Sequence, residues 1–302
     1  MASIKSWLKA ARLRTLPLAL SSILLGTFLA AFEYHMRWDV LILSIITALF
    51  LQVLSNFAND YGDFEKGTDN IHRIGPQRTV QSGEITAKQM RKAMGITASM
   101  ALLFGLILVF IGTAGVPVWK TILFIVLGLG CIVAAVKYTV GNNAYGYQGY
   151  GDVFVFVFFG LTGVVGTFYL HTQQLFFGAW LLGAVVGCFS VGVLNLNNMR
   201  DIVNDRNSGK NTIPVRMGFN MSKLYQSLLI GGGFLLSIIF TLLYFQCWWM
   251  LLPYCSVLLF YKDLKAIFSV KEPRLLDPFL RRLSIATLVY VLLFGIGLIL
   301  CI

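Results

Sequence analysis

The sequence has little charge and no long polar segment. Charged residues make up 12% of its 302 residues and hydrophobic residues 57%, whereas charged residues alone account for about 25% of an average soluble domain. No loop between the apolar stretches is long enough to form a separate soluble domain. The scarcity of charge therefore excludes an ordinary globular fold, and we expect residues 1–302 to form one polytopic membrane domain.

Cysteine is scarce as well. The five cysteines all fall in apolar stretches, and they are Cys131, Cys188, Cys247, Cys255 and Cys301. Their number is odd, and no two have the Cys-x-x-Cys spacing that is typical of zinc and redox sites. We therefore expect neither a disulfide framework nor a zinc site.

Long apolar stretches dominate what is present. We expect an all-α membrane protein with nine transmembrane helices, because most stretches approach the roughly 20 residues that a helix needs to cross a bilayer. The stretches are 15–33, 39–59, 91–112, 118–137, 153–171, 176–199, 223–244, 247–262 and 283–301.

The net charge of +11 is unevenly distributed along the chain. If the N-terminus is cytoplasmic, all but two of the 24 Lys and Arg residues fall on the cytoplasmic side, and the exceptions are Arg37 and Lys120. Membrane proteins orient with such basic segments inside. The distribution predicts a cytoplasmic N-terminus and, after nine spans, a periplasmic C-terminus. Orientation in a lipid bilayer therefore accounts for the excess of Lys and Arg, and we expect no nucleic acid as a partner.

Two acidic clusters lie where the second and sixth apolar stretches reach water. Each is an Asn followed by two Asp at helical spacing, and the members are Asn56, Asp60, Asp63 and Asn197, Asp201, Asp205. Residues three or four apart share one face of a helix. Carboxylates are costly next to hydrocarbon and mark functional sites there. The clusters recur about four helices apart, which suggests a weak internal repeat of helices 1–4 and 5–8, with helix 9 left over.

Metal and phosphate binding is the chemistry that these clusters favour. Acids at a helix C-terminus oppose the helix dipole, so a positive group should compensate them. Mg²⁺ prefers oxygen ligands and combines a few carboxylates with substrate phosphates. We expect both clusters to bind Mg²⁺, with Asp69 as a further candidate ligand. Basic residues that can bind a diphosphate flank the clusters, namely Arg73, Arg78, Lys210 and Arg216.

Longer motifs surround these residues. They are Arg14-Thr-Leu-Pro17, Asn59-Asp-Tyr-Gly-Asp63 with Lys66-Gly67, Arg73-Ile-Gly-Pro76, Tyr138-Thr-Val-Gly141, Gly149-Tyr-Gly-Asp152, and Asn197-Asn-Met-Arg-Asp201 through Gly209-Lys-Asn-Thr212. With them the chain resembles, over essentially its whole length, the UbiA-type intramembrane aromatic prenyltransferases. Within that superfamily it is most similar to the bacterial branch that acts on 1,4-dihydroxy-2-naphthoate in menaquinone synthesis.

The resemblance implies a nine-helix bundle around a central cavity in the bacterial inner membrane, with both acidic motifs at its cytoplasmic mouth. It implies Mg²⁺-dependent binding of a polyprenyl diphosphate, and its motifs add Arg14 and Lys66 to the candidate diphosphate ligands. The first motif of the superfamily often reads Asn-x-x-x-Asp-x-x-x-Asp. Here Phe64 occupies the last position, so Asp63, Asp69 or both complete the first metal site.

The implied reaction is ionisation of the diphosphate, attack by the naphthoate carbon that bears the carboxylate, and loss of CO₂. Catalysis is expected of the four cluster aspartates, with Tyr138 and Asp152 as candidates to hold the aromatic substrate or the cation. Two alternatives stay open at this point. In the first, the same reaction uses 4-hydroxybenzoate or another aromatic compound as the acceptor. In the second, the protein is a cation-coupled transporter, since acids in membrane helices also mark ion pathways.

Overall fold

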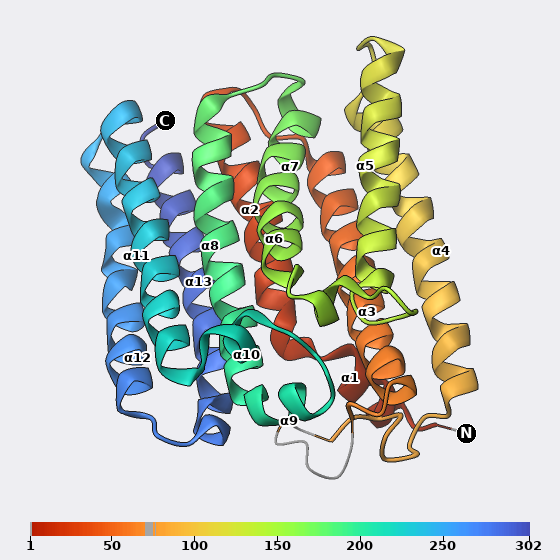
Figure 1. Ribbon diagram of the computed structural model, residues 1–302. Coiled ribbons are helices and arrows are strands. Elements are labelled where there is room, and N and C mark those ends of the chain that lie inside the picture. Colours follow the sequence, from red (N-terminus) through yellow and green to blue (C-terminus); the bar gives the residue numbers. More distant parts are fainter. Residues whose placement is uncertain (1, 70–74, 76) are drawn as a thin grey trace.

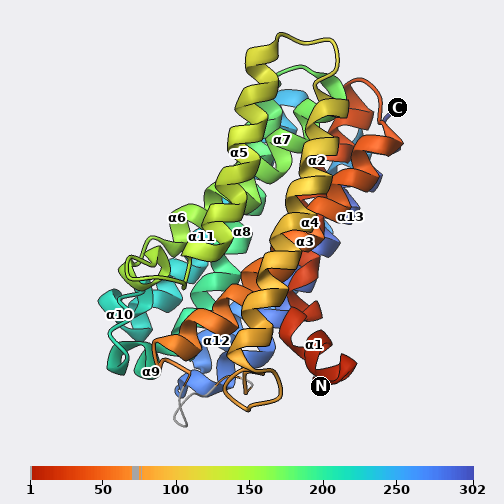
Figure 2. The ribbon, with the colours of Figure 1, turned by 90° about the vertical axis from the view of Figure 1, so that its right-hand side faces the viewer.

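The computed structural model describes residues 2–69, 75 and 77–302, and within them every regular element is a helix. Among these residues, eight helical segments are long and apolar enough to cross a membrane. They are α2 (Leu16–Glu33), α3 (Trp38–Glu65), α4 (Ala87–Gly112), α5 (Val118–Lys137), the continuous α6–η3–α7 segment (Gly151–Thr172), α8 (Phe177–Arg200), α11 (Phe219–Tyr244) and the η5–α13 segment (Pro273–Ile299). The segments run side by side in one bundle (Figures 1 and 2).

The apolar stretch 247–262, which we expected to be the eighth of nine spanning helices, is divided in the structure. It begins with the 3-10 helix η4 (Trp248–Ser256) and continues as α12 (Val257–Ser269). Neither part meets the length of a spanning helix alone. Pro253 lies inside η4, and proline lacks the backbone N–H that the regular α-helical ladder requires.

Helix ends at the basic end of the bundle determine where the acidic clusters lie. α3 ends at Glu65, six residues beyond the predicted stretch 39–59, so Asp60 and Asp63 lie on its last turns. α4 begins with a capping box in which Thr86 and Gln89 bond each other's backbone N–H. Short helices complete this end of the molecule, and they are α1 (Ile4–Ala11), η1 (Leu13–Thr15), η2 (Tyr145–Gln148), α9 (Ile202–Asn207) and α10 (Ile213–Met217).

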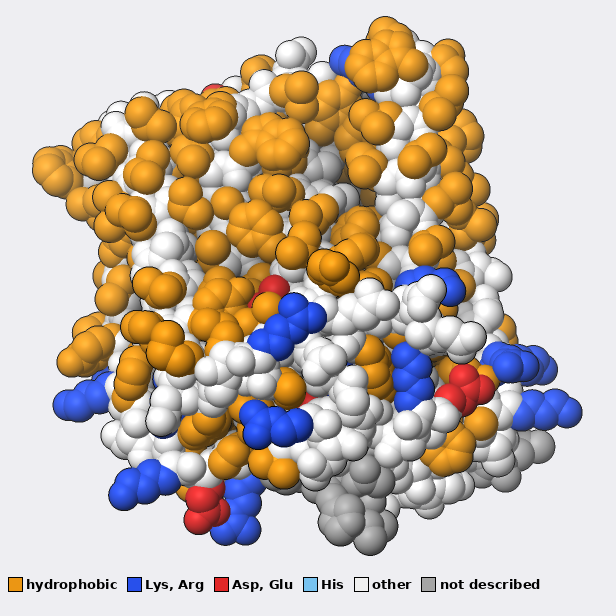
Figure 3. All heavy atoms as spheres, in the orientation of Figure 1, with side chains coloured by type: hydrophobic (Ala, Val, Ile, Leu, Met, Phe, Trp, Pro, Cys, Tyr) orange, Lys and Arg blue, Asp and Glu red, His pale blue; other side chains and the backbone are white. Residues whose placement is uncertain are grey.

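The helices are packed very unevenly. In the most apolar window of α8, 67% of the residues are buried, and aromatic residues such as Phe189 and Tyr290 fill the contact between α8 and α13. In α5 the corresponding fraction is 6%. α5 packs on α3 and α4, and the surface is hollowed between α5 and the α6–η3–α7 segment (Figure 3). α5 is therefore a wall of the bundle that has lipid-facing apolar side chains over most of its surface.

The two ends of the bundle differ in chemistry. Lys and Arg side chains gather at the end that carries α9 and α10, while the rest of the visible face is mainly hydrophobic (Figure 3). The N- and C-termini lie at opposite ends (Figure 1).

A disulfide joins Cys247 to Cys301 at the end of the bundle where the C-terminus lies, with a Cα–Cα distance of 5.8 Å. The expectation of no disulfide was wrong for this pair. The two cysteines are 54 residues apart in the chain, and the hairpin formed by η4–α12 and α13 brings them together. Cys131, Cys188 and Cys255 are free.

Candidate active site

A cavity of about 370 Å³ opens at the basic end and runs into the bundle between α2, α3, α4, α5, α6–η3–α7, α8 and α13. Its inner part is lined largely by apolar and aromatic side chains, among them Phe124, Leu127, Phe154, Phe158 and Phe159. Its mouth is polar, and the charged and amide side chains that line it include Arg12, Asn56, Asn59, Asp63, Arg78, Asn197, Lys210 and Arg281. The cavity thus offers an ionic mouth and an apolar interior.

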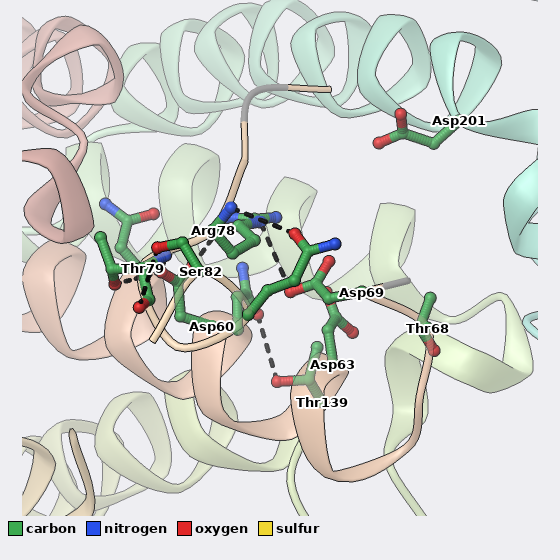
Figure 4. A network of polar contacts seen from close by, with 12 residues as sticks. Asp60, Asp63, Thr68, Asp69, Arg78, Thr79, Ser82, Thr139 and Asp201 are labelled. Carbon is green, nitrogen blue, oxygen red and sulfur yellow. Dashed lines mark hydrogen bonds and ion pairs between the residues drawn. The ribbon is translucent and has the colours of Figure 1, made fainter. Parts of the chain in front are cut away.

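Asp60 is held by basic residues from two other segments. The guanidinium groups of Arg12 and Arg78 both donate to its Oδ1, the latter at 2.9 Å, and the Thr79 hydroxyl donates to Oδ2 at 3.0 Å. Asp60 is only 1% exposed. Figure 4 shows Asp60, Asp63 and Asp69 around Arg78, with Asp201 on a separate element opposite them. Asp60 therefore anchors the guanidinium groups at the mouth instead of lining the cavity itself.

Asp63 and Asp69 have different surroundings. The Tyr147 hydroxyl donates to Asp63 Oδ1 at 2.8 Å, and Asp63 lines the cavity. Asp69 is buried, and one of its oxygens lies 3.8 Å from Arg78 Nε. Asp63 thus occupies the cavity-facing position of the first motif, and Asp69 supports Arg78 from behind.

The two asparagines of the clusters line the cavity. The Asn56 amide nitrogen donates to the Ala11 carbonyl at 2.9 Å and to the Thr15 hydroxyl at 3.2 Å, so the amide oxygen remains as its acceptor. The Asn197 oxygen accepts a hydrogen bond from Arg200 Nη2 at 2.9 Å.

Arg200 organises the second cluster, and sequence reasoning missed it. Its guanidinium donates to both oxygens of Asp201, at 2.9 and 2.6 Å, and to Asp277 of α13 at 2.6 Å. Arg200 is fully buried. The signal that could have identified it was a cation next to an acid at the end of a spanning helix, where charges are functional by default. Asp277 lay too far away in the chain to be recognised.

Lys210 connects the two clusters. Its ammonium lies 3.9 Å from Asp63 and 4.0 Å from Asp205, and 5.2 Å from the centre of the Tyr147 ring. Burial disfavours the charged form of Lys210, but the two carboxylates outweigh this effect and raise its pKa well above the usual value. Lys210 is therefore protonated at neutral pH and joins the second cluster to the first.

Tyr147 is a further residue that the sequence did not reveal. Besides bonding Asp63, its hydroxyl lies 2.6 Å from that of Thr68, and the Lys66 ammonium lies 3.8 Å from its ring centre. Burial and the nearby Asp63 carboxylate raise the pKa of this phenol, so it stays protonated and donates. Burial lowers the pKa of Lys66, and the neighbouring Lys210 adds to the effect while Asp63 opposes it.

The remaining predicted residues are placed as follows. Tyr138 lines the cavity and packs edge-on against Tyr145 at 5.4 Å. Asp152 does not line the cavity, because its carboxylate is turned to α11, where it accepts a hydrogen bond from the Tyr225 hydroxyl at 2.9 Å. It ties α6 to α11, contrary to our expectation of a group facing the substrate.

Three basic candidates remain. Arg216 is exposed and donates to the Gln148 carbonyl at 2.6 Å, so it holds the loop before α6 and is not brought to the clusters. The backbone of Arg14 lies in η1, but its side chain is not among the described parts. Arg73 lies outside the described residues.

The mouth fits a metal that is shared with a ligand. Within the described residues, no group of three or more His, Cys, Asp and Glu side chains is arranged to hold a metal ion alone. Mg²⁺ does not need one, because it binds through one or two carboxylates, water and substrate phosphates. The cavity-facing donors Asn56, Asp63 and Asn197 carry amide or carboxylate oxygens, which is the donor type that this ion prefers.

Comparisons with known proteins agree on one family. The model of the UbiA prenyltransferase family matches residues 19–288. The chain is 39% identical to 1,4-dihydroxy-2-naphthoate octaprenyltransferase of Escherichia coli (strain K12), over 97% of this chain and 94% of that protein. It is also 39% identical to the protein of the same name from Haemophilus influenzae, over 98% and 96% of the two chains.

Solved structures share the fold at lower identity. The apo structure of a UbiA homolog from Aeropyrum pernix K1 matches with a TM-score of 0.70 and 14% identity, over 99% of both chains. A UbiA homolog from Archaeoglobus fulgidus, bound to DMAPP and Mg²⁺, matches with a TM-score of 0.63 and 14% identity, over 97% of this chain and 99% of that one.

Proposed function

The chain belongs to the UbiA prenyltransferase family, and from this premise we propose that it transfers a polyprenyl group from a polyprenyl diphosphate to 1,4-dihydroxy-2-naphthoate. CO₂ and diphosphate leave, and the product is demethylmenaquinone after oxidation. The names of relatives that are 39% identical over nearly the whole chain support this acceptor.

The observation that carries the proposal is the division of the cavity into an ionic mouth and an apolar interior. A polyprenyl diphosphate has the same division, since a highly charged head is joined to a long hydrocarbon tail. The interior is lined by Phe124 and Leu127 of α5 on one side and by Phe158 and Phe159 of η3 on the other. The hollow beside α5 (Figure 3) gives a tail longer than the cavity a route into the lipid.

The head group is assigned to the cations at the mouth. Arg12, Arg78, Lys66 and Lys210 surround the first cluster, and guanidinium groups match the geometry of phosphate oxygens. Arg14 and Arg73 remain candidates from the sequence motifs. Arg216 and Asp152 are assigned to holding the fold, since each bonds a neighbouring element instead.

Mg²⁺ is the cofactor of the proposed reaction. When bound, it neutralises negative charge on the departing diphosphate. The cavity-facing donors Asn56, Asp63 and Asn197 would hold it. The other acids that the sequence suggested as ligands are assigned to holding the cations around the mouth, and they are Asp60, Asp69, Asp201 and Asp205. A solved structure of the same fold that is bound to DMAPP and Mg²⁺ supports the choice of this ion.

The chain's own residues then govern the allylic cation. The C–O bond breaks and its electron pair leaves with the diphosphate, which Arg78 and Lys210 stabilise electrostatically. The apolar interior excludes water that would otherwise capture the cation, and Tyr138 lies where the polar mouth meets this interior. The ring carbon bearing the carboxylate forms the new C–C bond. Loss of CO₂ returns the electron pair to the ring, so no base is required for this step.

The protein is a multi-pass membrane protein, and we assign nine passes by counting η4–α12 together as the eighth. The basic end, which carries the mouth of the cavity, is assigned to the cytoplasm of a bacterial inner membrane. The Cys247–Cys301 disulfide supports this orientation, because disulfides persist in oxidising compartments such as the periplasm and are rare in the cytosol.

The test is turnover by the purified full-length protein in detergent. Farnesyl, geranylgeranyl and octaprenyl diphosphates are offered with carboxyl-labelled 1,4-dihydroxy-2-naphthoate or 4-hydroxybenzoate, with Mg²⁺ or EDTA. We expect labelled CO₂ and prenylated product with the naphthoate and Mg²⁺ alone. Preference for 4-hydroxybenzoate would reject the assigned acceptor. Absence of transfer to either acceptor would reject the reaction, and because detergent abolishes ion gradients, turnover there would exclude an obligatory transport coupling.

A further inference from the structure

One basic side chain of the cavity is not engaged by an acid. Among the side chains that the structure describes, four cations line the cavity, namely Arg12, Arg78, Lys210 and Arg281. The first two bond Asp60, and Lys210 lies between Asp63 and Asp205. Arg281 of α13 has no ion pair with any residue that the structure describes. The adjacent Arg282 differs, since it lies 3.4 Å from Asp263 on α12.

Two serine hydroxyls line the cavity on the same side. Ser284 lies three residues after Arg281 on α13, and residues at this spacing are neighbours on one helix face. Ser190 comes from the adjoining α8. Both hydroxyl oxygens are buried, and neither has a hydrogen-bond partner within the described part of the chain. A buried polar group without a partner is destabilising, so a ligand that supplied partners would be bound in preference to an apolar one.

Arg281, Ser284 and Ser190 together form a polar wall of the cavity. The packing of α8 against α13 determines how deep in the bundle this wall lies. Arg200 bonds Asp277 at the basic end of the two helices, and Phe189 meets Tyr290 at a ring distance of 5.3 Å farther inside. Arg281 and Ser284 lie between these two contacts along α13. The wall therefore begins beside the second acidic cluster and continues into the apolar part of the cavity.

We propose that Arg281, Ser284 and Ser190 form the binding subsite for the aromatic acceptor. The guanidinium of Arg281 pairs with the acceptor carboxylate, and the two serines bond its phenolic hydroxyls. The proposal rests on the proposed function, since it names the part of the cavity that holds the second substrate. It also suits the reaction, because the carbon bearing the carboxylate then faces the mouth, to which the proposed function assigns the diphosphate.

A diphosphate is the other anion that could use Arg281, and ligand binding to the purified full-length protein separates the two. The probes are 1-hydroxy-2-naphthoate, 1-naphthol, which lacks the carboxylate, and farnesyl diphosphate with Mg²⁺. For Arg281→Gln we expect the Kd of 1-hydroxy-2-naphthoate to rise roughly ten- to a hundredfold, because a charge-assisted hydrogen bond is lost. The Kd values of 1-naphthol and farnesyl diphosphate should stay within about twofold. The first ligand carries no charge to pair with Arg281, and the second is assigned to the other cations of the mouth.

Two further variants make the test specific. Arg282→Gln removes the neighbouring positive charge and should leave all three Kd values unchanged, which controls for the general attraction of anions to this end of the protein. Ser284→Ala should weaken 1-naphthol and 1-hydroxy-2-naphthoate by a similar factor of about threefold to tenfold, because both carry the hydroxyl, and should spare farnesyl diphosphate.

Three results would overturn the subsite. They are a weakened Kd for farnesyl diphosphate with an unchanged Kd for the naphthoate in Arg281→Gln, equal effects of Arg281→Gln and Arg282→Gln, and failure of the wild-type protein to bind 1-hydroxy-2-naphthoate at all. Failure of the proposed function would give a different result. The wild-type protein would then show no prenyl transfer, or transfer to another acceptor, whereas these Kd values are measured without turnover.

Discussion

Replacing Tyr147 by phenylalanine tests whether the contact between the loop before α6 and the first acidic cluster matters for catalysis. The substitution removes one oxygen that donates to Asp63 at 2.8 Å and lies 2.6 Å from the Thr68 hydroxyl. It keeps the ring and with it the contact to the Lys66 ammonium at 3.8 Å. The change therefore isolates a single donor to a buried carboxylate.

The magnitude follows from the charge of the acceptor. A hydrogen bond to a charged group contributes about 1.5–3 kcal/mol, which corresponds to roughly a ten- to hundredfold change in rate or affinity. After Tyr147→Phe, the closest described cation to Asp63 is Lys210, at 3.9 Å. This is too long for a hydrogen bond, so the lost donor is not replaced. We expect kcat/KM for the polyprenyl diphosphate to fall by about ten- to a hundredfold.

The assay is the initial rate of prenyl transfer over a series of Mg²⁺ concentrations. If Asp63 binds the metal, the variant should need more Mg²⁺ for half-maximal rate, and its thermal unfolding should change little. Tyr150→Phe is the matched control, since Tyr150 lies in the same loop but is 56% exposed, and it should behave like the wild type. Values of kcat/KM and of the Mg²⁺ requirement within twofold of the wild type would refute the role assigned to Tyr147.

Three other predictions test the clusters, the topology and the disulfide. Asp60→Ala and Asp201→Ala should each reduce turnover to background while the protein stays folded, because the first releases the guanidinium groups at the mouth and the second releases Arg200, which also holds the cavity-lining Asn197. Near-wild-type activity of either variant in saturating Mg²⁺ would contradict this. On a cysteine-free background, a cysteine at Ser82 should react with impermeant maleimide from the cytoplasm and one at Gln173 from the opposite side, and the reverse pattern would invert the orientation. Cys247→Ser should lower the free energy of unfolding by about 2–4 kcal/mol, because the bond closes a long loop, and should leave kcat/KM unchanged. A large loss of activity would connect the disulfide to the mouth.

Sequence patterns located the helices well because a bilayer imposes a length and a polarity on each of them. The stretch 118–137 coincides with α5, and 176–199 differs from α8 by one residue at each end. The pattern failed at 247–262, where Pro253 divides an apolar stretch without changing its hydropathy. Hydropathy reports how apolar a segment is, and it does not report whether its backbone can form one continuous α-helix.

Helical spacing predicted a shared face for the first cluster, and the structure refines that prediction. Asn56, Asn59 and Asp63 line the cavity, whereas Asp60 is turned toward Arg12 and Arg78. Asn59 and Asp60 are both compatible with the same three- or four-residue spacing. The rotation of α3 about its axis decides between them, and that rotation depends on packing against other helices.

The partners of the buried acids explain why the rest of the site was out of reach. Acids near the end of a helix in low-dielectric surroundings require cations. The sequence therefore implies that these acids have cationic partners, but it does not show which residues they are. Arg78 and Lys210 were found because they follow the clusters closely, whereas Tyr147 lies 84 residues from Asp63 and Asp277 lies 77 residues from Arg200.

Arg12 and Arg281 were counted only toward topology, because the same residue type serves to orient a membrane protein and to bind an anion. Hydropathy and charge counts treat those two roles alike, and only the position of each guanidinium relative to the acids separates them. Arg12 forms an ion pair with Asp60, while Arg281 lines the cavity and forms no ion pair with a described residue. We therefore assign Arg281 to a substrate.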